Sequence, residues 1–295
     1  MAQSGQVAAL FEKALGEEVE LVAISTEGDH SRESLASLGG TGVFASALRE
    51  ALIAGECDAI VHSLKDLPTA SYPGLRIGAI PRRADARDAL VGFTLDALPQ
   101  SARVGTGSPR RVAQLKSFRP DLEVVDIRGN VDTRLARVGT DLDAVVLAVA
   151  GLTRLSRLDA VAEFLELGKW PTAPGQGALA IEVREDSKQL TAALKSVDHA
   201  SSRLAVLAER EVLARLEAGC AAPIGAMAVL DDELLFLTAT VYAPDGSRSV
   251  TSSHALVVEG STAERALLPS ELGARVAAEL LQLGAADLAP LGAAS

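Results

Sequence analysis

Residues 103–111 read RVGTGSPRR and carry, in order, the end of an apolar strand, a glycine-rich turn and the first residues of a helix. The same order recurs in EVVDIRGNVDTR at residues 123–134 and in AVVLAVAGLTR at residues 144–154. Short apolar runs that alternate with helices are typical of a sheet with helices on its faces. This repeated pattern predicts an α/β domain.

Arginines follow the strand ends in all three stretches. They are Arg110, Arg111, Arg128, Arg134 and Arg154. In an open α/β sheet, ligands bind beyond the carboxyl ends of the strands, where helix N-termini present free N–H groups. Residues 103–137 hold eight basic and four acidic residues, a local charge of +4 in a chain of −11. One arginine near a strand end is more often structural, but three such turns predict a cleft for a ligand with several carboxylates.

Residues 1–80 also alternate between predicted helices and strands. The helices are expected at Val7–Leu15 and Val43–Ile53, and the strands at Val19–Ile24, Ala59–His62 and Leu75–Ile80. Strands that are separated by helices favour a parallel sheet covered on both faces. We therefore expect a second α/β domain in this part of the chain.

Two proline-containing segments mark the predicted domain boundaries. Pro81–Asp85 leads out of the first domain, and Pro171–Gly177 leads back to a strand at Ala178–Val183. From Ser201 onward, a helix, alternating strand-like runs and a final helix indicate a small α+β domain. We expect domain 1 at residues 1–83 and 177–199, domain 2 at residues 84–176 and domain 3 at residues 200–295.

The composition narrows the classes of function. A net charge of −11 in 295 residues argues against nucleic-acid binding, because phosphates attract basic proteins. No apolar run reaches the roughly 18 residues of a membrane-spanning helix. The first residues lack the basic and apolar regions of a signal peptide, and two cysteines are too few for a disulfide framework. We expect a cytoplasmic protein that binds a small molecule, with no metal, no nucleic acid and no membrane as partners.

A lysine–aspartate pair and two cysteines are the other candidates for chemistry. Lys65 and Asp66 follow a predicted buried strand, although such a pair on a turn is more often a solvated surface pair. Asp66 could handle protons or stabilise a developing cation. Cys220 follows a helix and a glycine, and is either a small buried side chain or a loop thiol that could be alkylated. Cys57, at a strand edge, is interpreted as structural.

Six segments together resemble one enzyme family. They are HSLKDLPT from His62, GTGSPRR from Gly105, IRGNVDTRL from Ile127, LAVAGLTRL from Leu147, PTAPGQGALAIE from Pro171 and LEAGCAAPIGA from Leu216. Their order and spacing are similar to those of porphobilinogen deaminases, and the resemblance covers nearly the whole chain. It implies two doubly wound, periplasmic-binding-protein-like α/β domains and a small C-terminal α+β domain.

The resemblance also implies an activity and a set of functional residues. The family joins four porphobilinogen molecules head to tail, with loss of ammonia, on a covalent dipyrromethane primer, and then releases hydroxymethylbilane for haem and porphyrin biosynthesis. Cys220 would hold the dipyrromethane cofactor through a thioether, and Asp66 would be the catalytic carboxylate. The remaining residues would bind cofactor (Lys65, Ser63, Thr106, Ser108, Arg110, Arg111, Arg128, Arg134) or substrate (Arg110, Arg154, Gln176). A monomer is expected.

The chain departs from the family pattern in three places. The usual first strand and its Thr-Arg-Gly-Ser turn are missing, so we expect a truncated product or a reading frame begun at a downstream Met codon. Thr41 and Ser46 stand where many members have lysines, which removes two loop cations.

A solute receptor of the periplasmic type is the alternative, because it would also have two α/β lobes that bind anions at strand ends. Such a receptor needs neither the Lys65–Asp66 pair nor Cys220. An exported receptor would also need a signal peptide.

Overall fold

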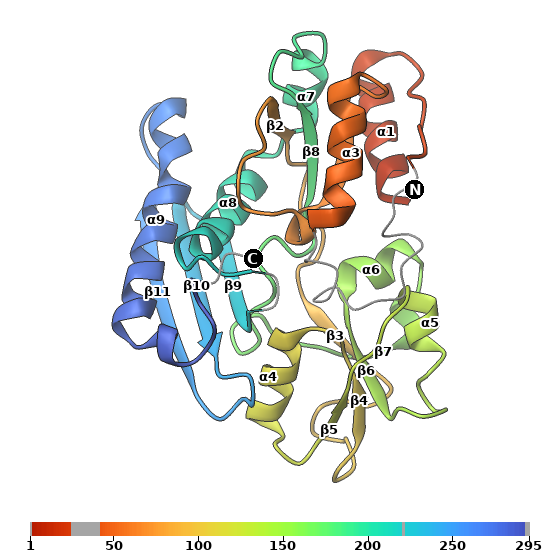
Figure 1. Cartoon of the computed structure of the whole chain (residues 1–295), viewed down its shortest axis with the longest axis vertical. Coiled ribbons are helices and arrows are strands. Elements are labelled where there is room, and N and C mark those ends of the chain that lie inside the picture. Colours follow the sequence, from red (N-terminus) through yellow and green to blue (C-terminus); the bar gives the residue numbers. More distant parts are fainter. Residues whose placement is uncertain (1, 25–41, 220–221, 293–295) are drawn as a thin grey trace. The chain divides into compact units, whose positions relative to one another are not determined.

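The computed structural model describes residues 2–24, 42–219 and 222–292, and the chain divides into two compact units (Figure 1). The first unit comprises residues 1–84 and 178–204, and the second comprises residues 85–177 and 205–294. The chain thus enters the second unit after Ala84, leaves it after Gly177 and enters it again after Leu204. The predicted separation of domain 2 from domain 3 within the second unit stays a prediction.

The first unit contains a three-stranded sheet and helices. Its elements are α1 (Ala2–Leu15), α3 (Gly42–Ala54), β1 (Ile60–Ser63), η1 (Leu64–Asp66), β2 (Leu75–Ala79), β8 (Leu179–Arg184), α7 (Thr191–Val197) and the start of α8 (Ala200–Arg215). Val7 and Phe11 of α1 pack with Ile181 and Val183 of β8 and with Leu194 of α7. Val7 and Phe11 of the predicted first helix therefore lie in the core, whereas Leu10 and Leu15 are exposed.

Two expectations for this unit are wrong. The described sheet is antiparallel, because β8 lies between β1 and β2 and runs opposite to both. The chain returns from the second unit to form that central strand, which local sequence patterns do not reveal. Residues 18–24, which include the whole strand expected at Val19–Ile24, have no regular structure, and Leu21 and Val22 are exposed. A strand requires a neighbour to accept its backbone hydrogen bonds.

The second unit begins with a five-stranded mixed sheet. Its elements are β3 (Asp88–Val91), β4 (Arg103–Gly105), α4 (Pro109–Phe118), β5 (Glu123–Val125), α5 (Val131–Leu135), β6 (Ala144–Ala148), α6 (Val149–Arg154), η2 (Leu158–Ala160) and β7 (Val161–Phe164). The strand order is β5-β4-β6-β3-β7, and β4 is parallel to β5 and β6. The first two strand–turn–helix repeats are confirmed. In the third, β6 passes directly into α6 at Val149, so the turn expected at Gly151 is wrong. The antiparallel strands β3 and β7 complete the sheet and were not predicted.

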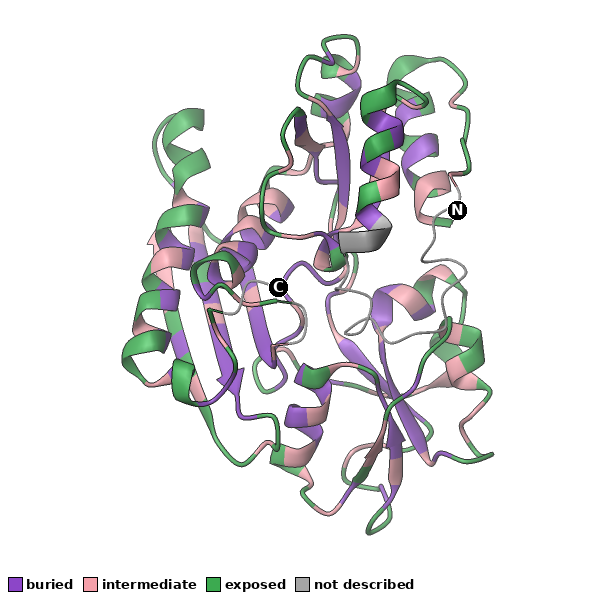
Figure 2. Ribbon diagram, viewed as in Figure 1, coloured by how far each residue is buried: buried purple, intermediate pink, exposed green. Residues whose placement is uncertain are grey.

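The C-terminal part of the second unit has the predicted α+β character. It contains β9 (Ile224–Asp231), β10 (Leu234–Tyr242), β11 (Ser249–Val257), α9 (Thr262–Gln282) and η3 (Ala285–Asp287). The three strands form an antiparallel sheet, and α9 packs on it (Figures 1 and 2). Within the described ranges, no helix has both the length and the hydrophobicity needed to cross a membrane.

The turn between β10 and β11 lies against the arginine-bearing helix α4. Gly246 in this turn has a φ of +73°, and a Cβ atom placed there would collide with the backbone at Ala113 and Ser117 of α4. Tyr242 at the end of β10 also receives a hydrogen bond from Gln114 of α4, at 3.3 Å. The turn therefore supports α4 and leaves no room for a side chain at position 246.

Gly246→Ala should lower the free energy of unfolding by roughly 3 kcal/mol, because it adds a backbone collision to an unfavourable φ. Gly139→Ala is the matched control, since Gly139 has a φ of +76° with no atom within 4 Å of an added Cβ. The control should cost about 1 kcal/mol. Urea unfolding of both variants measures the difference, and equal costs would contradict the proposed contact with α4.

Candidate active site

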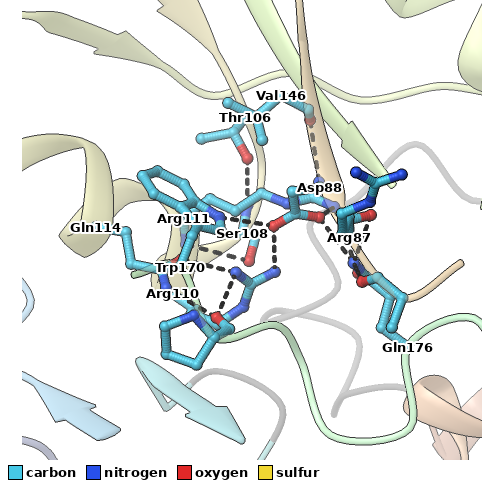
Figure 3. Close-up of polar contacts among 12 residues, drawn as sticks. Arg87, Asp88, Thr106, Ser108, Arg110, Arg111, Gln114, Val146, Trp170 and Gln176 are labelled. Atoms are coloured by element: carbon cyan, nitrogen blue, oxygen red, sulfur yellow. Dashed lines mark hydrogen bonds and ion pairs between the residues drawn. The ribbon is translucent and has the colours of Figure 1, made fainter. Parts of the chain in front are cut away.

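A buried carboxylate organises the polar residues of the second unit (Figure 3). Asp88, the first residue of β3, forms ion pairs with Arg110 at 2.9 Å and with Arg111 at 2.6 Å. It also accepts hydrogen bonds from Trp170 Nε1 at 2.9 Å and from Gln176 Nε2 at 2.8 Å. The structure therefore brings three predicted site residues, Arg110, Arg111 and Gln176, onto one carboxylate.

The turn between β4 and α4 places the two arginines. Ser108 is the N-cap of α4, and its hydroxyl accepts a hydrogen bond from the backbone N–H of Arg111. Pro109 occupies the first helical position, where its missing N–H costs nothing. Thr106 accepts a hydrogen bond from the N–H of Ser108 at 3.2 Å. The predicted residues Thr106 and Ser108 thus fix the start of the helix that carries Arg110 and Arg111.

Both arginine side chains are held at more than one point. Arg110 Nη1 donates to Gln114 Oε1 at 2.6 Å and to the carbonyl of Pro171 at 3.2 Å. Arg111 Nη1 donates to the carbonyl of Val146 at 3.0 Å. The residual exposure is 3% for Arg110 and 6% for Arg111, so their positions are set by the protein before any ligand binds.

Asp88 remains ionised in this setting. Burial alone would raise its pKa, but the charges of Arg110 and Arg111 and their hydrogen bonds outweigh burial and hold the pKa far below its ordinary value. One carboxylate faces two guanidinium groups, which leaves the cluster with a net charge of +1. A positive cluster of this kind attracts an anion.

The turn between β5 and α5 supplies two further cations. Asn130 caps α5 by accepting a hydrogen bond from the N–H of Thr133 at 2.9 Å. Arg134 Nε donates to the carbonyl of Gly129 at 2.9 Å. Arg128 is exposed, and among the described residues it has a loose ion pair with Asp126, at 3.7 Å. The guanidinium groups of Arg128 and Arg134 are therefore less constrained than those on α4.

The electrostatics link these two turns. Burial lowers the pKa of Arg134, and the positive charges of Arg111 and Arg128 lower it further. The turns that carry these arginines follow β4 and β5, which are neighbouring parallel strands of one sheet, so the three residues share one region of the second unit. We refer to Arg111, Arg128 and Arg134 as the arginine cluster.

Arg154, at the end of α6, adds a donor without an acceptor. Its Nε is buried and makes no hydrogen bond in the described structure, and the Nε atoms of Arg110 and Arg111 share this state. Burial lowers the pKa of Arg154. Buried N–H groups in proteins nearly always have acceptors, so these atoms favour a ligand that brings oxygen atoms.

In the first unit, η1 presents the predicted lysine and aspartate directly after β1. The N–H of Leu64 donates to the carbonyl of Ala178 at 3.0 Å, which fixes the start of the turn. Asp66 is exposed and Lys65 is half-buried. Ser63 accepts a hydrogen bond from Gln3 at 2.5 Å. Asp66 is thus held on a defined turn while its carboxylate stays open to solvent.

Glu182 of β8 anchors the strand that leads into this turn. It forms two hydrogen bonds of 2.9 Å with Arg49, and His62 lies 3.1 Å from it. Burial would raise the pKa of Glu182, but hydrogen bonds from His62 and Arg49 lower it to about 2. His62 immediately precedes Ser63, so Glu182 fixes the backbone beside the predicted site residues.

Some predicted positions stay untested. Cys220 and Thr41 lie outside the described residues. Ser46 is exposed on α3. Cys57 is half-buried, and burial raises the pKa of its thiol, which makes it a poor nucleophile.

Three organising residues were not identified from the sequence: Asp88, Trp170 and Glu182. Asp88 had a recognisable signal, since it is a charged residue at the start of the apolar run DALV. Glu182 likewise ends the apolar segment ALAI. A carboxylate whose side chain is buried within a strand requires cationic or hydrogen-bonding partners.

Comparisons with known proteins identify the family of this chain. The model of the porphobilinogen deaminase dipyromethane cofactor binding domain matches residues 1–192, and that of the porphobilinogen deaminase C-terminal domain matches residues 203–282. The chain belongs to the porphobilinogen deaminase family. A porphobilinogen deaminase from Leifsonia xyli is 60% identical over 99% of this chain and 91% of the relative. One from Cutibacterium acnes is 52% identical over 99% and 94%.

Solved structures of solute-binding proteins are only distantly similar. An ancestral cationic amino acid solute binding protein has a TM-score of 0.41 and 18% identity, covering 66% of this chain and 77% of that chain. An arginine-specific periplasmic binding protein from Salmonella typhimurium has a TM-score of 0.37 and 15% identity, covering 66% and 81%. This similarity is too low to support a receptor function. Membership of the porphobilinogen deaminase family decides against the receptor alternative.

Glu182→Gln should make the protein less stable and less sensitive to acid. A carboxyl group whose pKa falls from 4.5 to about 2 on folding stabilises the protein above pH 4.5, and this stability is lost as the pH falls towards 2. The variant should therefore lose roughly 3 kcal/mol above pH 4.5 and show a flatter decline below it.

Urea unfolding across this pH range provides the measurement. Glu271→Gln, which removes an exposed pair with Arg275, is the control and should change stability by less than about 0.5 kcal/mol. If Glu182→Gln and the parent lose stability equally as the pH falls, the lowered pKa of Glu182 does not contribute to the acid sensitivity.

Proposed function

We infer that this chain is a transferase that deaminates four porphobilinogen molecules and joins them head to tail on a dipyrromethane primer. It releases hydroxymethylbilane for tetrapyrrole biosynthesis. Family membership over nearly the whole chain supports the reaction. The observation that ties it to particular residues is the set of buried Nε atoms of Arg110, Arg111 and Arg154, which have no acceptor among the described residues.

The arginines of the second unit fit a group that bears carboxylates. A buried guanidinium N–H without an acceptor costs free energy, and a carboxylate is its best matched partner. The acetate and propionate side chains of a dipyrromethane provide such carboxylates. We assign cofactor binding to Lys65, Ser63, Thr106, Ser108, Arg110, Arg111, Arg128 and Arg134, and substrate binding to Arg110, Arg154 and Gln176.

Cys220 is the proposed attachment point of the cofactor. Its assignment rests on the segment LEAGCAAPIGA, because the residue itself lies outside the described structure. Cys57 is the only other cysteine in the sequence, and its half-buried thiol has a raised pKa. When bound, the dipyrromethane supplies the pyrrole carbon to which the first substrate is joined.

Asp66 is the proposed catalytic carboxylate. Porphobilinogen loses ammonia when its aminomethyl C–N bond breaks, and the remaining fragment is a cation of the azafulvene type. The group leaves as ammonia from its protonated form, so the positive charge moves from nitrogen onto the pyrrole, and a fixed carboxylate beside the pyrrole stabilises that charge in the transition state. Because Asp66 is exposed, it can also exchange protons with water between additions.

We also propose that the chain works as a monomer in the cytoplasm. The acidic composition and the two cysteines support this setting, since a disulfide framework would need more cysteines. The reaction uses small molecules and needs no nucleic acid or membrane partner.

Asp66→Asn should reduce porphobilinogen turnover by two or more orders of magnitude, equivalent to about 3 kcal/mol of transition-state stabilisation. The amide keeps the shape of the side chain and loses its charge, so Asp66→Glu should retain more activity. Asp58→Asn is the control, because Asp58 is an exposed aspartate of the same unit that pairs with Arg184. Near-normal turnover of the Asn variant would place the catalytic group elsewhere.

Cys220→Ala should abolish attachment of the cofactor, because a methyl group forms no thioether. Acidic dimethylaminobenzaldehyde colours a bound dipyrromethane, so the variant should give no colour. Cys57→Ala is the matched control and should give the same colour as the parent. Equal colour from Cys220→Ala and the parent would disprove this attachment.

A further inference from the structure

Asp88 has more hydrogen-bond partners than a structural ion pair needs. Its Oδ1 accepts from Arg111 and Gln176, and its Oδ2 accepts from Arg110 and Trp170. Asp88 has no exposed surface. A carboxylate that is enclosed by four donors cannot itself contact a ligand, so any effect on the reaction must pass through its partners.

Arg111 is the partner through which such an effect would travel. Its two terminal nitrogens are occupied by Asp88 and by the carbonyl of Val146. Its Nε is buried without an acceptor. The positive charge of Arg111 also helps to lower the pKa of Arg134. The position of the Arg111 guanidinium therefore determines where the arginine cluster presents positive charge.

Without a charge at position 88, this arrangement would not persist. Arg110 and Arg111 are adjacent in sequence, both contact Asp88, and their positive charges would then repel each other in a buried setting. Arg110 has alternative acceptors in Gln114 and Pro171. Within the described part of the chain, Arg111 would keep the carbonyl of Val146 and a distant contact of 3.5 Å with Gln176. Arg111 is thus the side chain that would move.

We propose that Asp88 is a positioning residue for the polymerisation. It holds Arg111, which we assign to the cofactor, in a geometry that also binds carboxylates of the substrate and the growing chain. This inference rests on the proposed function. Trp170 and Gln176 contribute to this positioning, because each donates a hydrogen bond to an oxygen of Asp88 and limits the orientations that the carboxylate can adopt.

The test compares four forms of the holoprotein: the parent, Asp88→Asn, Trp170→Phe and Asp121→Asn. Asp88→Asn removes the charge at nearly constant shape and should raise the KM for porphobilinogen about tenfold, with a smaller change in kcat per folded molecule. Trp170→Phe removes one donor and keeps a ring that can stack on Phe118, so KM should rise by about two- to threefold. Asp121→Asn breaks an ion pair with Arg119 elsewhere in the same unit and should leave KM unchanged.

A double-mutant cycle distinguishes positioning from general stabilisation. In an Arg111→Gln background, Asp88→Asn and Trp170→Phe should change KM by less than twofold, because the residue on which they act is gone. Circular dichroism gives the folded fraction of each variant. If Asp88→Asn does not fold, Trp170→Phe decides the test alone.

The outcomes separate this inference from the proposed function. Suppose that the parent consumes porphobilinogen but that KM is unchanged in Trp170→Phe and in Asp88→Asn, if the latter folds. This result would overturn the inference about Asp88 and leave the proposed function standing. So would KM effects of the same size in the Arg111→Gln background. If the parent consumes no porphobilinogen, the proposed function fails. The inference about Asp88 is then tested with citrate, a ligand with several carboxylates, by measuring how much citrate raises the melting temperature of each form. Citrate should stabilise the parent and Asp121→Asn at least twice as much as Trp170→Phe, and equal stabilisation or none would overturn the inference.

Discussion

The carboxylate of Asp88 is fully buried, and burial of a charge costs several kcal/mol unless nearby groups compensate for the lost water. Arg110 and Arg111 provide opposite charge, and Trp170 and Gln176 provide neutral N–H donors. The two arginines in turn could not be buried side by side without this anion. Each partner is therefore stable in place only because the others are present.

The same interaction joins three distant segments of the second unit. Asp88 begins β3, the arginines open α4, and Trp170 and Gln176 belong to the segment that leads back to the first unit. Gln176 also donates to the carbonyl of Ala86 at 2.8 Å, just after the chain has entered the second unit. The segments by which the chain enters and leaves this unit are thus fixed to the helix that carries Arg110 and Arg111.

Local patterns in the sequence predicted much of this structure, while long-range pairing was beyond their reach. The turns between β4 and α4 and between β5 and α5 were located correctly, because glycine, helix caps and apolar periodicity act over a few residues. The turn expected at Gly151 was not, since this residue lies inside α6. The antiparallel direction of β8 was not predicted, because its neighbours β1 and β2 lie about a hundred residues earlier. Arg110 and Arg111 were recognised as candidates because they follow a turn. Their partner Asp88 was missed, because it lies in a strand that was not predicted. The roles of Asp66 and Cys220 came from family motifs rather than from local physics.

The central claim is that this chain builds a pyrrole polymer on a primer attached to itself, and intact-mass measurement tests it most directly. The purified protein should be heavier than its polypeptide by one dipyrromethane. A limited amount of porphobilinogen should then produce additional species, each heavier than the last by one pyrrole unit. A protein with the mass of the bare polypeptide, unchanged after porphobilinogen is added, would contradict the account.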